Sequence, residues 1–302
     1  MTAPGRRRVI KTLREDPRVR KFAIPAYRGL TKMLAFGTGP RVLVNSVHKS
    51  GTHLVTTLVR QLPGTVHSGR HYVLDNFRTT PERPAVWGET PEVDWRRLRE
   101  TFASFNHGQF LTSHFQAEPE LLSILDELGF RTVFIVRDPR DVVVSSTFYM
   151  TRLERHVMHR RYAEDFTTDH DRIMMTITGF PPGPNGLGSV SIARRIEGYL
   201  GWSSAPGVYG CRFEDLIGPN GGGDPDVQRT QIEAIARHLG HSPTEEHIDR
   251  LARKTWSENS PTFRKGAIGD WRNHFTDEHK AAFKEIAGRH LIALGYERDL
   301  DW

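Results

Sequence analysis

The sequence predicts a single α/β domain in which helices flank a central parallel β-sheet. Short apolar runs typical of buried strands recur along the chain, and segments with apolar residues at helical spacing separate them. The 302 residues are 37% hydrophobic and 26% charged, an ordinary composition for a globular protein with a substantial core. In such a sheet, ligands bind at the carboxyl ends of the strands.

The expected elements alternate along the chain. Strands are expected at residues 41–45, 109–113, 131–136 and 207–213, and helices at 52–62, 119–128, 190–200, 226–239, 244–254 and 277–294. A further helix is expected after residue 136, with Asp138 as its N-cap and Pro139 at its first position. Residues 63–106 and 179–189 interrupt this order, and we expect them to pass over the sheet and cover a site.

Residues 1–36 form a basic N-terminal segment ahead of the domain at residues 37–302. A helix is expected at residues 25–35, where Tyr27, Leu30 and Leu34 would pack on the core. Alternatively, this segment contacts the substrate or an anionic membrane surface. The formal net charge of +6 and a pI near 9.6 favour anionic partners. Because no long apolar run or leader sequence is found, we expect a cytoplasmic protein with at most peripheral membrane contact.

The stretch NSVHKSGTHLVTTLVRQL, residues 45–62, joins an expected strand to an expected helix through a polar loop. Lys49, Ser50, Gly51 and Thr52 lie where backbone N–H groups and a helix N-terminus would meet an anion. The arrangement is similar to a P-loop, but no glycine precedes Lys49 as the nucleotide triphosphatase motif requires. The loop is therefore expected to bind a different phosphate-bearing group.

Two further groups of anion-binding residues follow. Arg137 comes directly after the strand at 131–136, with Ser145 two helical turns past Asp138. The third group consists of Arg264, Lys265 and Gly266 in RKGAIGDW. Three such groups predict a ligand with more than one anionic centre.

In three motifs the sequence resembles the sulfotransferases that use 3′-phosphoadenosine 5′-phosphosulfate (PAPS) and release adenosine 3′,5′-bisphosphate (PAP). HKSGTH is similar to that family's 5′-phosphosulfate loop, VRDPRDVVVS to its 3′-phosphate segment, and RKGAIGDWRNHFT to its C-terminal nucleotide motif. The resemblance runs from residue 41 to residue 296, in the family's order. It implies that the polar loop binds the phosphosulfate of PAPS.

The resemblance also implies roles for single residues. Lys49 would stabilise charge on the leaving phosphate, and His114, in FLTSHF, would be the general base. The residues that it assigns to the donor are Lys49, Ser50, Gly51, Thr52, His53, Arg137, Ser145, Phe213, Thr255, Trp256, Arg264, Lys265 and Gly266. The chain departs from the family at His53, where many relatives carry an adenine-stacking tryptophan, so Trp256 is expected to stack on the base, with Thr255 as a nearby hydrogen-bonding group. Phe213 replaces a tyrosine and Thr112 a lysine.

No metal is expected, because lysine and arginine supply the positive charge in this scheme. Cys211 is the single cysteine, which excludes a disulfide framework and a multi-cysteine metal site. His156 and His159 could share a helical face, but no third ligand accompanies them.

The expected acceptor is a small molecule, natural product, lipid or glycolipid with a hydroxyl, less readily an amine. Phe115, Phe148 and Tyr149 are expected to line its site, although these rings could equally be core. Two alternatives stay open: a P-loop kinase of a small molecule, and a non-catalytic protein that binds nucleotides or polyanions. Nucleic acid is not the expected partner, and the sequence leaves the oligomeric state open.

Overall fold

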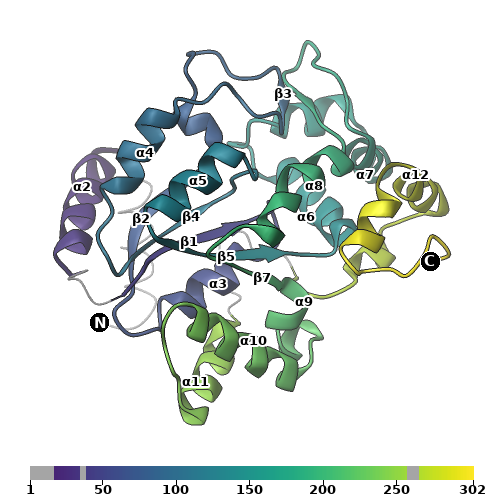
Figure 1. The fold of residues 1–302 in the computed structure, drawn as a ribbon. Coiled ribbons are helices and arrows are strands. Elements are labelled where there is room, and N and C mark those ends of the chain that lie inside the picture. Colours follow the sequence, from purple (N-terminus) through teal and green to yellow (C-terminus); the bar gives the residue numbers. More distant parts are fainter. Residues whose placement is uncertain (1–16, 35–38, 257–264) are drawn as a thin grey trace, which may run out of the picture.

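A five-stranded parallel sheet forms the centre of the computed structural model, which describes residues 17–34, 39–256 and 265–302 (Figure 1). Its strands, in the spatial order β2-β4-β1-β5-β7, are Val66–Tyr72, Gln109–Ser113, Arg41–Ser46, Phe130–Val136 and Val208–Arg212. Each neighbouring pair is parallel. The carboxyl ends of β1 and β4 are level, since Asn45 pairs with Ser113. The loops that leave these ends therefore meet at one edge of the sheet.

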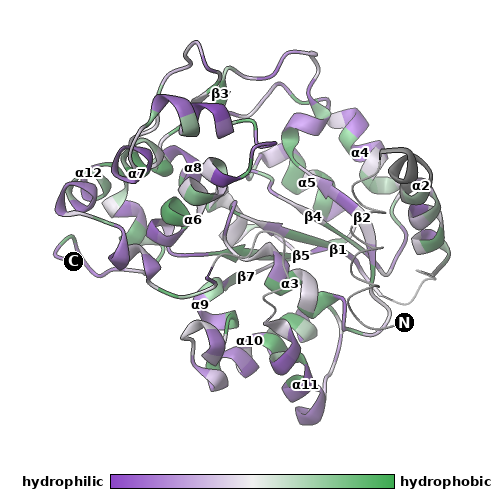
Figure 2. Ribbon diagram, turned by 180° about the vertical axis from the view of Figure 1, so that it is seen from behind, coloured by the Kyte–Doolittle hydropathy of each residue, from purple (hydrophilic) through white to green (hydrophobic). Residues whose placement is uncertain are grey.

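Helices cover both faces of the sheet, as the continuous apolar strands predict. One core cluster packs Val42, Val44 and Ile135 against α3 (Thr52–Val59), α10 (Pro225–His238) and α11 (Glu245–Thr255). The other packs Leu43, Leu111 and Phe134 against helices on the opposite face (Figure 1): α4 (Trp95–Ala103), α5 (Pro119–Glu127), α6 (Pro139–Arg152), α7 (Asp169–Thr178), α8 (Ile192–Leu200) and α12 (Asp277–Ala293). Figure 2 shows the central strands as largely hydrophobic and the outer helices as mixed. The predicted single α/β domain is confirmed.

The predicted elements are found within a few residues of their expected bounds. The strand at Gln109–Ser113 has the expected bounds, and the helix expected at 119–128 ends one residue earlier. Asp138 caps α6 by accepting the backbone N–H of Arg140, and Pro139 is the first helical residue. Proline fits there because the first N–H groups of a helix have no partner within it.

The N-terminal helix differs from the prediction. Helix α2 spans Pro17–Leu34 and holds Pro25 in its interior instead of beginning there. Tyr27 and Leu30 are 46% and 51% exposed, so the expectation that they pack on the core is wrong. The Tyr27 hydroxyl instead donates to the carbonyl of His67 on β2. The side chain of Leu34 lies outside the described residues.

Both long interruptions contain regular structure that the sequence did not predict. Residues 63–106 supply β2, the 3₁₀ turn Leu74–Phe77, β3 (Val86–Trp87) and α4. The interruption at 179–189 supplies β6 (Gly188–Ser189), and the chain ahead of it forms a π-helical turn at Arg161–Asp165 and then α7. Strands β3 and β6 pair in parallel and so join the two interruptions above the sheet (Figure 1). No helix among the described residues has both the length and the apolar character needed to span a membrane.

Candidate active site

The loop between β1 and α3 has the geometry of an anion-binding turn. Gly51 is the N-cap of α3, with a φ of 105°. A side chain there would place its Cβ 2.8 Å from the Phe213 ring and 3.2 Å from Ile135, so the backbone path requires glycine. Lys49 has a φ of 68°, the one positive φ of a non-glycine residue in the described chain. Strained backbone of this kind is concentrated at ligand-binding turns.

The side chains of this loop leave donors for a ligand. The Ser50 hydroxyl is buried and has no hydrogen-bond partner among the described residues. Thr52 shares a hydrogen bond of 2.6 Å with the hydroxyl of Ser46. The Lys49 ammonium lies 3.9 Å from the centroid of the Tyr149 ring, which brings two residues from separate motifs together. The orphaned hydroxyl, the ammonium and the helix N-terminus fit a phosphate-type anion.

Arg137, at the end of β5, lies beside the C-terminal motif. Its guanidinium donates to the carbonyl of Ala267 at 2.7 Å, pairs with Asp141 at 3.2 Å and covers the Phe213 ring at 4.3 Å. The Nε atom is buried without a partner in the described residues. One donor of this fork is therefore open to a ligand, while the other holds the guanidinium in place.

Asp141 fastens the C-terminal motif to α6. Its two carboxylate oxygens accept the backbone N–H groups of Gly269 and Trp271 at 2.8 and 2.9 Å. The same carboxylate pairs with Arg137, so one buried acid positions both predicted anion-binding segments. Sequence reasoning missed this residue; its signal was a second aspartate one turn after the Asp138 cap.

The other residues predicted to bind anions differ in how exposed they are. Lys265 pairs with Asp270 at 2.9 Å and is half exposed. Gly266 has a φ of 61°, a backbone conformation that favours glycine. Ser145 is buried on α6. Arg264 lies outside the described residues.

His114 follows β4 and contacts the end of β1. Its Nδ1 atom lies 2.9 Å from the carbonyl oxygen of Ser46, which can only accept. The Ser46 hydroxyl lies 3.1 Å from the same Nδ1 atom and can accept as well as donate. The carbonyl therefore favours the tautomer with the proton on Nδ1 and the lone pair of the neutral ring on Nε2. Burial, with smaller contributions from His71 and Lys49, lowers the pKa of His114 to about 3. The imidazole is thus neutral at pH 7 and has the form that a general base needs.

Two further histidines surround His114. The His48 ring stacks on it at 4.0 Å between centroids, and His71 on β2 meets it edge-on at 4.8 Å. His71 also shares a 2.9 Å hydrogen bond with the Thr112 hydroxyl. Burial lowers the pKa of both His48 and His71. Sequence reasoning missed His71, because the polar strand that carries it was not predicted.

A cavity of about 280 Å³ opens beside His114. Its lining includes six side chains from four segments of the chain: His48, Trp87, His114, Gln116, Arg195 and Tyr199. The Tyr199 hydroxyl donates to the carbonyl of His114 at 3.2 Å. This cavity lies under β3, where the two interruptions meet, so their predicted role as a cover is consistent with the fold.

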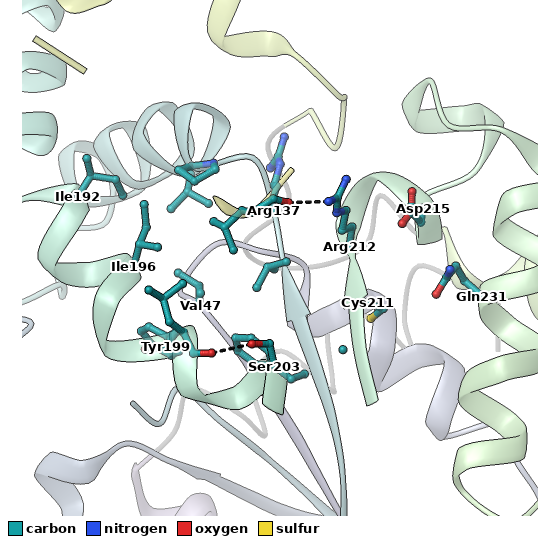
Figure 3. A pocket seen from close by; sticks show the side chains of 17 residues that line it. Val47, Arg137, Ile192, Ile196, Tyr199, Ser203, Cys211, Arg212, Asp215 and Gln231 are labelled. Carbon is teal, nitrogen blue, oxygen red and sulfur yellow. Dashed lines mark hydrogen bonds between the residues drawn. The ribbon is translucent and has the colours of Figure 1, made fainter. Parts of the chain in front are cut away.

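A second cavity of about 390 Å³ lies between α8 and the β5–β7 edge of the sheet (Figure 3). Arg137 and Arg212 line one end of it, and Tyr199 and Ser203 line the other. Aliphatic side chains, including Val47 and Ile196, fill most of the wall between them. It contains neither His114 nor a residue of the polar loop from Lys49 to Thr52, so it is not the place of the predicted chemistry.

Comparison with known proteins decides the family. The family model described as "Sulfotransferase domain" matches residues 39–295. This chain belongs to the sulfotransferase domain family. Among curated proteins it is similar to the 3-alpha-hydroxysteroid sulfotransferase of Cavia porcellus, with 21% identity over 220 residues, 66% of this chain and 69% of the relative. The 3-beta-hydroxysteroid sulfotransferase of the same animal is 22% identical over 221 residues, covering 67% of this chain and 69% of the relative.

A solved structure supports the same fold. The mouse sulfotransferase SULT7A1 complexed with PAP has a TM-score of 0.54 and 16% sequence identity, and the match covers 88% of this chain and 89% of that one. The sulfotransferase fold predicted from three short motifs is thereby confirmed, and the chain is a transferase of the sulfotransferase type.

The residues expected near the adenine of a sulfotransferase donor are less exposed than that role suggests. The Thr255 side chain is 1% exposed, and its hydroxyl donates to the carbonyl of Leu251, one turn back. Trp256 caps α11 and packs partly buried against the core. Phe213 is buried between Gly51 and Arg137. His53 is the exception, since it is exposed on the first turn of α3; partial desolvation of its ring and the charge of Lys49 lower its pKa.

The three aromatic residues expected at the acceptor site of this sulfotransferase have different surroundings. The Phe115 ring is fully buried in the core and contacts Phe102, whereas its carbonyl accepts the Trp202 indole N–H. Tyr149 lies under Lys49, as described above. Phe148 meets His274 edge-on at 5.0 Å. Among the described residues, no cluster of three histidine, cysteine or acidic side chains could hold a metal ion.

Proposed function

We propose that this sulfotransferase transfers the sulfuryl group of PAPS to a hydroxyl of a small-molecule acceptor, with His114 as the general base. The observation that carries the proposal is the Nδ1–H hydrogen bond from His114 to Ser46, which leaves a basic Nε2 at the cavity of about 280 Å³. Hydroxysteroid sulfotransferases among the relatives support a hydroxyl over an amine as the acceptor.

Two sites on the chain would hold the donor. Lys49, Ser50, Gly51 and Thr52 would bind the 5′-phosphosulfate through the ammonium, the orphaned Ser50 hydroxyl and the N-terminus of α3. The second site, for the 3′-phosphate, would consist of Arg137, Ser145, Arg264, Lys265 and Gly266. The buried, unpartnered Nε of Arg137 supports this assignment. When bound, PAPS supplies an activated sulfuryl group whose bond to phosphate is the one that breaks.

The chain's own residues would then manage charge and protons. Nε2 of His114 would take the proton of the acceptor hydroxyl as its oxygen bonds to sulfur. The Lys49 ammonium would balance the charge left on the phosphate oxygen when the S–O bond of the donor breaks. Tyr149 keeps that ammonium above its ring, and the anionic donor beside His114 raises the low proton affinity of the imidazole.

The test is the replacement His114→Asn. Asparagine places an N–H near the position of Nδ1, so the hydrogen bond to Ser46 can persist while the basic Nε2 is lost. We expect PAP affinity to stay within about twofold and turnover to fall by roughly 10²- to 10⁴-fold, the usual contribution of a general base. His71→Asn is the matched control, since His71 is a second histidine that contacts the His114 ring edge-on. Full turnover of His114→Asn would refute the role.

Two other assignments remain proposals beside this one. We assign the acceptor to the cavity of about 280 Å³, because His114 lines it. Tyr149 and Phe148, which were also expected at the acceptor site, lie on α6, the helix that follows Arg137. We also propose that the N-terminal segment packs on the domain through α2, since the Tyr27 hydroxyl donates to the carbonyl of His67. The kinase alternative predicts preference for ATP over PAPS, and a binding module predicts indifference to His114→Asn.

A further inference from the structure

Arg195 is a buried cation without an anion. It lies on α8 and is 3% exposed. Its Nε, Nη1 and Nη2 atoms all lack a hydrogen-bond partner within the described residues. A guanidinium stays protonated in proteins, and fully buried charges are normally paired. The uncompensated cost of such a group is several kcal/mol, so an unpaired arginine at this depth calls for a ligand.

The groups around Arg195 are neutral. Its guanidinium carbon lies 4.4 Å from the centroid of the Trp87 ring. The titratable groups within range of its charge are the hydroxyls of Tyr162 and Tyr199 and the rings of His48 and His156. A cation–π contact stabilises a desolvated arginine but offsets only part of the burial cost.

The acids that share the cavity with Arg195 do not neutralise it. Asp75 pairs with Arg78 at 3.1 Å and with Arg83 at 3.2 Å. Glu89 also lines the cavity, but no ion pair within the described residues joins it to Arg195. Within the described residues, the guanidinium of Arg195 beside this cavity therefore stays unneutralised.

Arg195 and the proposed base belong to one wall of this cavity. The ring centroids of His114 and His48 are 4.0 Å apart, and those of His48 and Trp87 are 5.5 Å apart. The guanidinium of Arg195 lies over the Trp87 ring. A molecule that lies against this wall can therefore contact both His114 and Arg195, since both line the cavity. A volume of about 280 Å³ suits a small ligand.

We propose that the acceptor carries a carboxylate as well as its hydroxyl, and that Arg195 binds the carboxylate while the hydroxyl faces His114. The inference rests on the proposed function and narrows its substrate class to small hydroxy acids. A carboxylate is preferred because its two oxygens match the planar fork of a guanidinium. Binding it would give the buried cation its missing partner, and a neutral analogue would leave that cation unpaired.

The test uses a panel of small hydroxyphenyl carboxylic acids, each assayed beside its methyl ester with PAPS. For the full-length protein we expect kcat/KM to favour the acids by at least about tenfold, as one desolvated charge pair provides. Arg195→Met should abolish that preference, and Arg195→Lys should keep part of it. Arg194→Met is the matched control, because Arg194 precedes Arg195 on the same helix with a side chain that is 75% exposed.

Two results would overturn the inference. One is equal use of acids and esters by the unmodified protein. The other is an equal loss of kcat/KM with acids and esters in Arg195→Met, which would mean that Arg195 acts on the sulfuryl group or supports the fold. If no panel compound is sulfated, thermal shift of the PAP complex decides: stabilisation by acids and not by esters supports the inference, and no difference refutes it. Failure to bind PAP at all would instead refute the proposed function, and this inference with it.

Discussion

Acid should destabilise this sulfotransferase through His114. The pKa of His114 is about 3 in the folded protein and about 6.5 for a free imidazole. Between these values the unfolded chain binds a proton that the folded protein does not, so stability falls as the pH falls from about 6.5. Above pH 6.5 the ring is neutral in both states and contributes no pH dependence.

The size of this loss of stability follows from the difference between the folded and unfolded pKa values of His114. Each pH unit below 6.5 costs about 1.4 kcal/mol for one such group, so lowering the pH to 5 costs about 2 kcal/mol through His114 alone. His67 and His156, whose pKa values burial lowers to about 4, act in the same direction. Such losses of stability are a large fraction of the free energy of unfolding of a typical domain, which is about 5–15 kcal/mol.

Urea unfolding at pH 7 and pH 5, without nucleotide, measures this cost. We expect the free energy of unfolding to fall between the two pH values by about 2 kcal/mol less in His114→Asn than in the unmodified protein. His107→Asn, a replacement at an exposed histidine, is the control and should not change the fall. An equal fall in all three proteins would show that His114 is not held neutral by burial, and would refute the reasoning.

Three further outcomes concern the loop and its supports. Gly51→Ala should weaken PAP binding by about tenfold, because the new Cβ meets the Phe213 ring and the φ of 105° is strained for alanine; unchanged affinity by calorimetry would contradict this. Tyr149→Phe should keep kcat/KM for sulfuryl transfer, whereas Tyr149→Leu should lower it by about 3- to 30-fold through loss of the ring under Lys49; equal effects would argue against that contact. Asp141→Asn should destabilise the fold by about 3 kcal/mol, because the carboxylate accepts two backbone N–H groups and pairs with a buried arginine; scanning calorimetry that finds under about 1 kcal/mol would contradict it.

The parts of the fold that the sequence predicts are those with strong local signals. The β-branched run of β5 and the Asp138–Pro139 cap of α6 fix their elements without help from the rest of the chain. Strand β2, Val66–Tyr72, could not be predicted, because its residues are mostly polar or glycine. It forms at the edge of the sheet by pairing with β4, and such pairing depends on residues about 40 positions away.

The site likewise has residues with a local sequence signal and residues whose role depends on distant segments. The loop from Lys49 to Gly51 has a local motif, so its geometry follows from a short stretch. By contrast, Asp141 and Arg195 act through contacts with distant segments. Neither has a motif of its own, and burial turns each from an ordinary charged residue of an amphipathic helix into a group that must be paired.

The most direct test of the central claim is calorimetric titration of the purified protein with PAP, run beside ADP and without added metal. The account predicts tight binding of PAP, at least about tenfold weaker binding of ADP, which lacks the 3′-phosphate, and loss of this difference in Arg137→Ala. Equal affinity for PAP and ADP, or no binding of PAP, would contradict a PAPS-dependent sulfotransferase and return the kinase and polyanion-binding alternatives to the front.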